Sequence, residues 1–246
     1  MKLRNKTAII TGGGSGFGAG IAKSFSKEGA KVIVADIDME KAKEIAEQTN
    51  GIPIKVDVSN KISVETMISE VLSQVKDVDI LVNNAGITHL PAPMERVEEK
   101  DFDNILAVNV KSVFLTAHFL VPHFKNKKSG TILNIASTAG VSPRANLTWY
   151  NASKGWMITA TKGMAIELAS EGIRVNAINP VAGETPLLKS FMGEDTPEMR
   201  KKFLATIPLG RFSTPKDIGN TATFLCSDEA SMITGVALEV DGGRCI

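Results

Sequence analysis

The sequence predicts an α/β protein built on a doubly wound parallel sheet of about seven strands, with helices on both faces. Short β-branched apolar runs alternate with longer amphipathic stretches along all 246 residues. Each pair of runs is joined by one helical stretch, a connection that places consecutive strands parallel. No linker, repeat or low-complexity tract interrupts this pattern. We therefore expect a single domain over residues 1–246.

The expected elements follow from the period of the apolar residues. The expected strands cover residues 7–11, 31–35, 52–56, 79–82, 131–136, 174–178 and 236–240. The expected helices cover residues 18–28, 39–48, 61–75, 99–124, 150–170 and 217–225. The polar segment of about residues 186–210 carries scattered Met and Phe and is expected to form one or two short helices in a lid over the substrate.

Composition narrows the classes of function. The net charge of +1 gives no reason to expect nucleic acid or a membrane as partner. The two cysteines and three histidines show neither metal-binding spacing nor a disulfide framework, so we expect no metal. We find no signal sequence and no apolar stretch near the roughly 20 residues of a membrane span. We expect a reduced, cytoplasmic setting.

A glycine-rich turn follows the first strand, in the order Gly12-Gly13-Gly14-Ser15-Gly16-Phe17-Gly18. Glycines let the backbone approach a pyrophosphate closely, and the free N–H groups of a following helix favour the anion. The spacing fits Gly14-x-Gly16-x-x-Ala19, a common dinucleotide fingerprint. It also fits Gly12-x-x-x-Gly16-x-Gly18, which we prefer because this turn begins where the strand ends.

Asp36 closes the second strand, close to the offset of about 20 residues at which an acid binds the adenosine ribose. Its carboxylate would repel a 2′-phosphate, and neither Ser15 nor Ile37 is a cation that would receive one. The expected cofactor is therefore NAD, with NADP less favoured. Alternatively, Asp36 caps the helix 39–48, although Asp38 is better placed for that role.

Tyr150 is the only tyrosine of the chain, and Lys154 follows four residues later. On a helix the two side chains share a face, so we expect the ammonium to lower the tyrosine pKa from its usual value of about 10. Tyr150 then suits proton transfer, and Ser137 ends the strand 131–136 just before it. Alternatively, the pair shares a helix face by chance.

Two further sets of polar residues are candidates for the site, one after an expected strand and one inside an expected helix. Asn83-Asn84-Ala85-Gly86 follows the strand 79–82, at the edge where such sheets bind ligands, although the same residues also form ordinary turns. Asn109 lies between apolar neighbours in the helix 99–124 and needs hydrogen-bond partners. It either holds a water in a site or caps a neighbouring carbonyl.

Taken together, these residues resemble the short-chain dehydrogenase/reductase family over essentially the whole chain. The markers, in chain order, are Thr11-Gly12-x-x-x-Gly16-x-Gly18, Asp57-Val58, Asn83-Asn84-Ala85-Gly86, Asn109, Ser137, Tyr150-x-x-x-Lys154 and Asp241-Gly242-Gly243. The resemblance implies a Rossmann-type sheet, a small-molecule substrate and a homo-oligomer, commonly a tetramer formed through the long helices.

The resemblance also implies roles for individual residues. Tyr150 would be the general acid/base, Ser137 would hold the substrate oxygen, and Lys154 would lower the tyrosine pKa and bind the nicotinamide ribose. Asn109 would hold a water that relays protons to solvent. The candidates for cofactor binding, including Tyr150 and Lys154, are Gly12, Ser15, Gly16, Phe17, Gly18, Asp36, Ile37, Asp57, Val58, Asn83, Asn84, Ala85, Gly86, Pro180, Gly183 and Thr185.

Three positions depart from the usual family pattern. The chain has Pro180-Val181 where the family usually has Pro-Gly, Gly183 where it often has isoleucine, and Phe17 where it most often has isoleucine. We expect an unusual path for the loop over the nicotinamide.

The expected reaction is NAD-dependent oxidation of a secondary alcohol, such as a sugar, a polyol or a small hydroxy acid. An alternative is a 3-oxoacyl-[acyl-carrier-protein] reductase. Asp36 argues against it because such reductases generally use NADPH, and so does the acidic Glu171 where they tend to carry a basic residue for the carrier protein. An alternative of another class is a non-catalytic NAD-binding protein.

The substrate pocket is the least informative part of the sequence. His89, Arg144 and Asn146 lie near the expected catalytic residues, and His89 with Arg144 would suit an anionic group such as a carboxylate or sulfonate. Alternatively, Arg144 is a solvated loop charge and His89 a surface loop residue.

Overall fold

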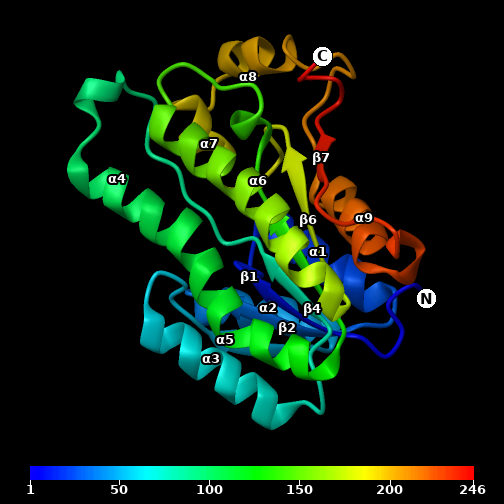
Figure 1. The fold of residues 1–246 in the computed structure, drawn as a ribbon. Coiled ribbons are helices and arrows are strands. Elements are labelled where there is room, and N and C mark those ends of the chain that lie inside the picture. The colour runs from blue at the N-terminus through cyan, green and yellow to red at the C-terminus, as the bar shows by residue number, and fades with distance from the viewer.

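The computed structural model describes residues 1–246, and a seven-stranded parallel sheet forms its centre (Figure 1). The strand order is β3-β2-β1-β4-β5-β6-β7. The strands are β1 (Thr7–Thr11), β2 (Lys31–Asp36), β3 (Ile52–Lys55), β4 (Ile80–Asn83), β5 (Gly130–Ile135), β6 (Ile173–Pro180) and β7 (Ala237–Val240). The expected doubly wound Rossmann-type sheet is confirmed.

Helices cover both faces of this sheet. They are α1 (Gly16–Lys27), α2 (Met39–Thr49), α3 (Lys61–Gln74), α4 (Glu99–Ile105), α5 (Ser112–Lys127), α6 (Thr148–Leu168), α7 (Leu188–Met192), α8 (Pro197–Leu204) and α9 (Pro215–Cys226). One core cluster joins α1, α2 and α9 to the sheet, and a second joins α3, α5 and α6 to it. The helices thus form two layers on opposite faces.

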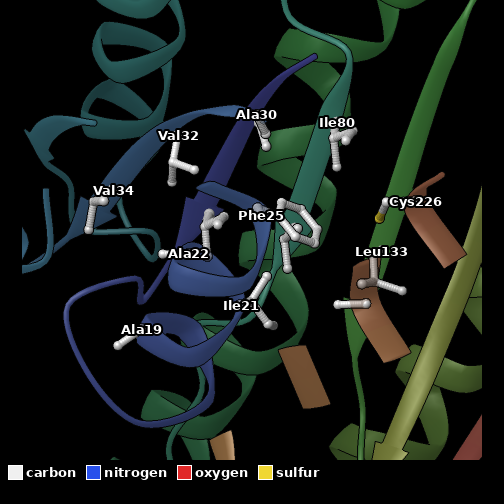
Figure 2. Close-up of a cluster of buried hydrophobic side chains, with 14 of the residues drawn as sticks. Ala19, Ile21, Ala22, Phe25, Ala30, Val32, Val34, Ile80, Leu133 and Cys226 are labelled. Carbon is white, nitrogen blue, oxygen red and sulfur yellow. The ribbon is translucent and has the colours of Figure 1, made fainter. Parts of the chain in front are cut away.

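The α1 side shows how the strand runs become a core. Phe25 and Ile21 of α1 are fully buried and pack towards Val32 of β2 and Ile80 of β4 (Figure 2). Burying a side chain of this size stabilises the fold by about 1.5–3 kcal/mol. Such contacts fix α1, and with it the glycine-rich turn that precedes it.

The strand order reverses at β1, because the chain moves from β1 out to β3 and then returns to β4 on the other side. Sheets of this type bind ligands in the crevice at the carboxyl ends of the strands at such a point. The residues that follow β1, β2, β4 and β5 are therefore brought to one edge.

The stretch 99–124, which was expected to form one regular α-helix, is not regular in its middle. A π-helical segment, Leu106–Lys111, joins α4 to α5, and Asn109 lies within it. By length and hydropathy alone, Glu99–Lys127 would also cross a membrane, contrary to the expectation from sequence. Its buried residues Leu115, Leu120 and Phe124 pack instead in the core cluster that covers the sheet.

The expected lid contains two short helices, α7 and α8, as the sequence predicted. They share a small apolar cluster with Val181, Ile207 and Phe212. The carboxyl terminus lies beside this region (Figure 1), where the Leu209 N–H donates to the Gly242 carbonyl over 3.1 Å. The lid and the C-terminal turn are therefore held together.

Candidate active site

A cavity of about 440 Å³ opens at the carboxyl ends of the strands and extends to both sides of the reversal point. Its lining includes most of the residues expected to bind a cofactor: Gly12, Ser15, Gly16, Phe17, Asp36, Ile37, Asp57, Val58, Asn84, Ala85, Gly86, Tyr150, Lys154, Pro180, Gly183 and Thr185. A cavity of this size suits a cofactor or a small substrate.

The glycine-rich turn has the shape that the preferred spacing requires. Gly12 and Gly16 have φ of +62° and +53°, a region that favours glycine. A Cβ at Gly18 would lie 2.1 Å from the Gly12 carbonyl oxygen, so no side chain fits there. Helix α1 begins at Gly16, and its first N–H groups face the cavity edge where a pyrophosphate would be favoured.

Asp36 is fixed at the adenosine end of this cavity. Its carboxylate accepts the N–H of Gly14 at 2.9 Å and the N–H of Asp38 at 3.0 Å. Asp38, not Asp36, caps α2, because its side chain accepts the N–H groups of Glu40 and Lys41. The capping alternative for Asp36 is therefore wrong. Lys41 pairs with Asp38, which leaves no free lysine at this end.

The segment after β4 divides into lining and supporting residues. The Asn84 amide donates to the carbonyl oxygens of Thr11 and Gly12 at 2.9 and 3.0 Å, and so ties this segment to the glycine-rich turn. Asn83 is buried and bonds to Asn134 and to the Thr116 hydroxyl. Asn83 does not line the cavity, and neither does Gly18, so their roles in cofactor binding stay predictions.

Tyr150, Lys154 and Ser137 meet at the other end. Tyr150 and Lys154 lie one turn apart on α6, with Nζ 5.9 Å from the centre of the phenol ring. Lys154 Nζ donates to the Ile135 carbonyl at 2.8 Å. Ser137 lies two residues after the end of β5, and its side chain accepts the N–H of Ala139.

The pKa of Tyr150 departs from the expectation. Burial raises it to about 12, and the nearby Ser137 hydroxyl and Arg144 guanidinium only partly offset this effect. Burial likewise lowers the pKa of Lys154 to about 8. The expected lowering of the tyrosine pKa by Lys154 is therefore wrong for the protein alone, because desolvation of the phenolate outweighs the attraction of the cation.

Asn109 is fully buried and makes three hydrogen bonds, with room for one more donor at Oδ1. Its Oδ1 accepts the Ile87 N–H, and its Nδ2 donates to the Ile87 carbonyl and to the Ser153 hydroxyl. A methyl group at Gly86 would lie 3.4 Å from both Asn109 Oδ1 and Lys154 Nζ. The two polar atoms therefore flank one small space beside Gly86, although Asn109 itself does not line the cavity.

The three substrate candidates have different outcomes. Arg144 lines the cavity and is only partly exposed, so it is not a solvated loop charge. His89 is buried rather than on the surface, but its Nδ1 bonds to the Leu90 carbonyl and it does not line the cavity. Asn146 is exposed at a turn with φ of +64° and does not line it either.

Two of the departures from the family pattern lie against each other. A Cβ at Gly183 would lie 2.3 Å from Cζ of Phe17 and 2.9 Å from the Ser213 hydroxyl oxygen. The Phe17 ring thus occupies the space that a side chain at residue 183 would fill. The loop after β6 can lie this close to the glycine-rich turn because residue 183 has no side chain where the Phe17 ring lies.

Three residues at the lid end were not predicted from the sequence. Phe191 of α7 lies edge-on to Tyr150, with ring centres 5.0 Å apart, and Phe203 of α8 lies under Arg144 at 4.3 Å. Arg244 lies close enough to lower the pKa of Arg144. In the sequence, only the scattered Phe residues of the lid and the arginine after Gly242-Gly243 could have indicated these three residues.

The structure holds no group of three or more His, Cys, Asp or Glu side chains arranged to bind a metal ion. The family model described as enoyl-(acyl carrier protein) reductase matches residues 12–244. The chain belongs to the short-chain dehydrogenase/reductase family. Members of this family are oxidoreductases that bind a nicotinamide cofactor and act on small molecules.

Individual relatives cover the whole chain. The chain is 46% identical to 4-formylbenzenesulfonate dehydrogenase of Comamonas testosteroni, over all of both chains. It is 38% identical to a 3-oxoacyl-[acyl-carrier-protein] reductase of Thermotoga maritima, again over all of both chains. A 3-ketoacyl-(acyl-carrier-protein) reductase from Brucella melitensis, solved with NADH, matches 99% of this chain and 100% of its own, with a TM-score of 0.95 and 51% identity.

Proposed function

We propose that the protein is an NAD-dependent oxidoreductase that transfers a hydride between NAD and a secondary alcohol, such as a sugar, a polyol or a small hydroxy acid. The convergence of Ser137, Tyr150 and Lys154 on one end of the cavity carries this proposal. The opposite end carries Asp36 and the glycine-rich turn, which suit a dinucleotide. The cavity therefore holds proton-transfer groups and a cofactor cradle together.

The roles of the protein groups follow from their chemistry. NAD supplies the hydride acceptor, or the donor in its reduced form. Ser137 donates a hydrogen bond to the substrate oxygen and orients it. Tyr150 takes the hydroxyl proton during oxidation and returns it during reduction. Asn109, next to Gly86 and Lys154, would hold the water that carries this proton to solvent.

The surroundings of Tyr150 determine how readily it exchanges this proton. The phenol is neutral at pH 7, as an unburied phenol would also be, and burial raises its pKa further to about 12, so it is ready to protonate a substrate. Oxidation needs the phenolate, which the Ser137 hydroxyl and the Arg144 guanidinium stabilise in part against burial, and the ammonium of Lys154 one helical turn away would add a further attraction. Oxidation is therefore expected to accelerate as the pH rises, and reduction to be favoured at lower pH.

The preference for NAD rests on charge at the adenosine end. The only cations that line the cavity are Arg144 and Lys154, and both follow β5 rather than β2. Asp36 presents a carboxylate where NADP carries a phosphate. The test is kcat/KM with NAD⁺ and NADP⁺ for the wild type and Asp36→Asn. Asp36→Asn should narrow the ratio between the two cofactors, while equal use of both by the wild type would refute the preference.

The alternative is a 3-oxoacyl-[acyl-carrier-protein] reductase. It is favoured by two relatives with this name, from Thermotoga maritima and Brucella melitensis. Against it, Glu171 is acidic where a basic residue would meet the carrier protein, and Lys128 beside it is bound to that carboxylate. A non-catalytic NAD-binding protein is the third reading, and it would not need Ser137, Tyr150 and Lys154 together.

The deciding experiment is NAD⁺ reduction by the wild type and Tyr150→Phe. The substrates are pooled polyols and sugars, then hydroxy acids, then hydroxyacyl thioesters. Activity in one of the first two pools that disappears in Tyr150→Phe supports the proposal. Activity with thioesters alone favours the acyl reductase. Tight NADH binding with no turnover in any pool favours the binding protein.

We also propose that the protein is a homotetramer. Exposed apolar side chains on α5 and α6 support an interface there, since Phe114, Trp156 and Ile166 are 59%, 41% and 82% exposed in the single chain. Sedimentation velocity should give four chains for the wild type and fewer for Phe114→Glu. A monomeric wild type would refute the assembly.

A further inference from the structure

The lid end of the cavity contains an arginine with no charge partner. The Arg144 guanidinium stacks on the Phe203 ring at 4.3 Å, and its Nη2 is buried without a hydrogen-bond partner. Arg144 belongs to no ion pair. By contrast, Arg200 pairs with Asp195 and Glu184 on the neighbouring lid surface.

A second guanidinium lies beside the first. Arg244, from the C-terminal turn, lies within electrostatic range of Arg144, and the two charges repel. Its Nη1 donates to the Ser142 hydroxyl at 3.0 Å, while its Nε is buried and has no partner. The nearby Asp241 carboxylate forms no ion pair with Arg244, and it accepts the N–H groups of Gly243 and Cys245.

No acid that lines the lid end of the cavity pairs with Arg144. The acidic residues that line the cavity are Asp36 and Asp57, which follow β2 and β3 on the far side of the sheet reversal. Removing cationic groups from water without an anion or a full set of hydrogen bonds is unfavourable, so buried charges normally have partners. The missing partner at this site is an anion.

The space between the arginine and Tyr150 is apolar. Leu147, Phe191 and Phe203 line it, and the Phe191 ring contacts the ring of Tyr150. Arg144 and Tyr150 line the same cavity, so one small molecule can contact both. A planar guanidinium held on an aromatic ring leaves its edge free for two parallel hydrogen bonds to an oxyanion.

We propose that the substrate is a small apolar or aromatic alcohol or carbonyl compound with a carboxylate or sulfonate at the end opposite the reacting carbon. Arg144 binds this anionic group, and Arg244, which lies behind the cavity lining next to Ser142, adds positive charge nearby. This inference rests on the proposed function, because it places the reacting carbon at Tyr150. It narrows the substrate class from sugars, polyols and small hydroxy acids to organic anions.

The kinetic test compares a charged and an uncharged substrate of the same shape. The pair is the secondary alcohol para-(α-hydroxyethyl)benzoate and its parent, α-methylbenzyl alcohol, each with NAD⁺. Arg144→Gln should raise KM for the benzoate by about 10- to 100-fold, with little change in kcat, and change KM for the parent by less than about twofold. Arg96→Gln, which removes an exposed arginine, is the control and should change neither value.

The binding test needs no turnover. Benzoate and benzenesulfonate, added with NADH, should raise the melting temperature of the wild type and of Arg96→Gln but not of Arg144→Gln. Without an anion, Arg144→Gln should be at least as stable as the wild type, because it removes an unpaired charge. If Arg144→Gln fails to fold, the same comparison is made with Arg244→Gln, which should weaken anion binding in the same direction.

The outcomes separate this inference from the proposed function. The anion site would be overturned if Arg144→Gln raised KM equally for the charged and the uncharged alcohol. It would also be overturned if anions did not raise the melting temperature of the wild type. Turnover of the uncharged alcohol alone would overturn the anion site while leaving the dehydrogenase in place. Anion binding without turnover of either alcohol would support the site and count against the proposed reaction.

Discussion

The contact between Phe17 and Gly183 gives the sharpest test of the cofactor end of the cavity. Gly183→Ala adds one methyl group, and its Cβ would lie 2.3 Å from Cζ and 2.6 Å from Cε1 of the Phe17 ring. Residue 183 is not among the glycines with positive φ, so alanine meets no backbone strain there. The effect of the substitution is therefore purely steric.

The magnitude follows from the space available. An ordinary contact is at least 3.4 Å, so the ring must move by about 1 Å or more from its 2.3 Å position. The Ser213 hydroxyl oxygen at 2.9 Å blocks relief on the loop side. Overpacking of this kind destabilises by about 1–3 kcal/mol. Phe17 lines the cavity, so the ring moves into the space proposed for the cofactor.

We expect Gly183→Ala to weaken NADH binding by about 5- to 100-fold, with a smaller loss of folding stability. Phe17→Leu shortens the side chain and removes the clash, so the double variant should bind NADH better than Gly183→Ala alone. NADH fluorescence titration and urea unfolding of the wild type, both single variants and the double variant give the coupling free energy. If the effects of the two single substitutions added up to the effect of the double variant within about 0.5 kcal/mol, the steric account would be refuted.

Further predictions concern individual groups of the site and the fold. Gly18→Ala should abolish NADH binding, because its Cβ would lie 2.1 Å from the Gly12 carbonyl oxygen; near-normal affinity in a titration would contradict the turn geometry. Lys154 has a pKa lowered to about 8, so the folded state releases its proton before the unfolded state, and stability should rise between pH 8 and 10. Melting curves of Lys154→Met should lose this rise, and an unchanged pH dependence would exclude Lys154 as its source. Gly163→Ala adds a Cβ that meets nothing within 4 Å in the interior of α6, so it should stabilise the dissociated single chain by about 0.5–1 kcal/mol, measured by urea unfolding at low protein concentration. A loss of stability confined to the assembled protein would agree with the proposed interface, which includes Trp156 and Ile166 of the same helix.

The elements that depend on local pattern were predictable from the sequence. The apolar run of β1, the glycines after it and the acid after β2 each report a local requirement of backbone shape or charge. Parallel connections then bring the strand ends to one edge whatever the loops do. Asp36 and Tyr150 could therefore be placed in one cavity although 114 positions separate them.

Properties that depend on burial could not be predicted in the same way. The Tyr150-x-x-x-Lys154 spacing places both groups on one helix face, but it does not give the desolvation of either group. Both are almost fully buried. Burial raises the pKa of Tyr150 and lowers the pKa of Lys154, so it favours the neutral form of each group. The π-helical segment around Asn109 has the same origin, since partners in the Ile87 loop and in α6 fix that side chain.

The charge balance of the lid end depends on contacts between distant parts of the chain. Arg144 and Arg244 are one hundred positions apart, and Phe203 comes from a third segment. Each arginine alone resembles a surface charge in the sequence, and only their meeting beside an apolar wall leaves two guanidinium groups with unpartnered nitrogens. Because buried cationic groups are stabilised by an anionic partner, the substrate proposal rests on this meeting of distant segments rather than on any motif in the sequence.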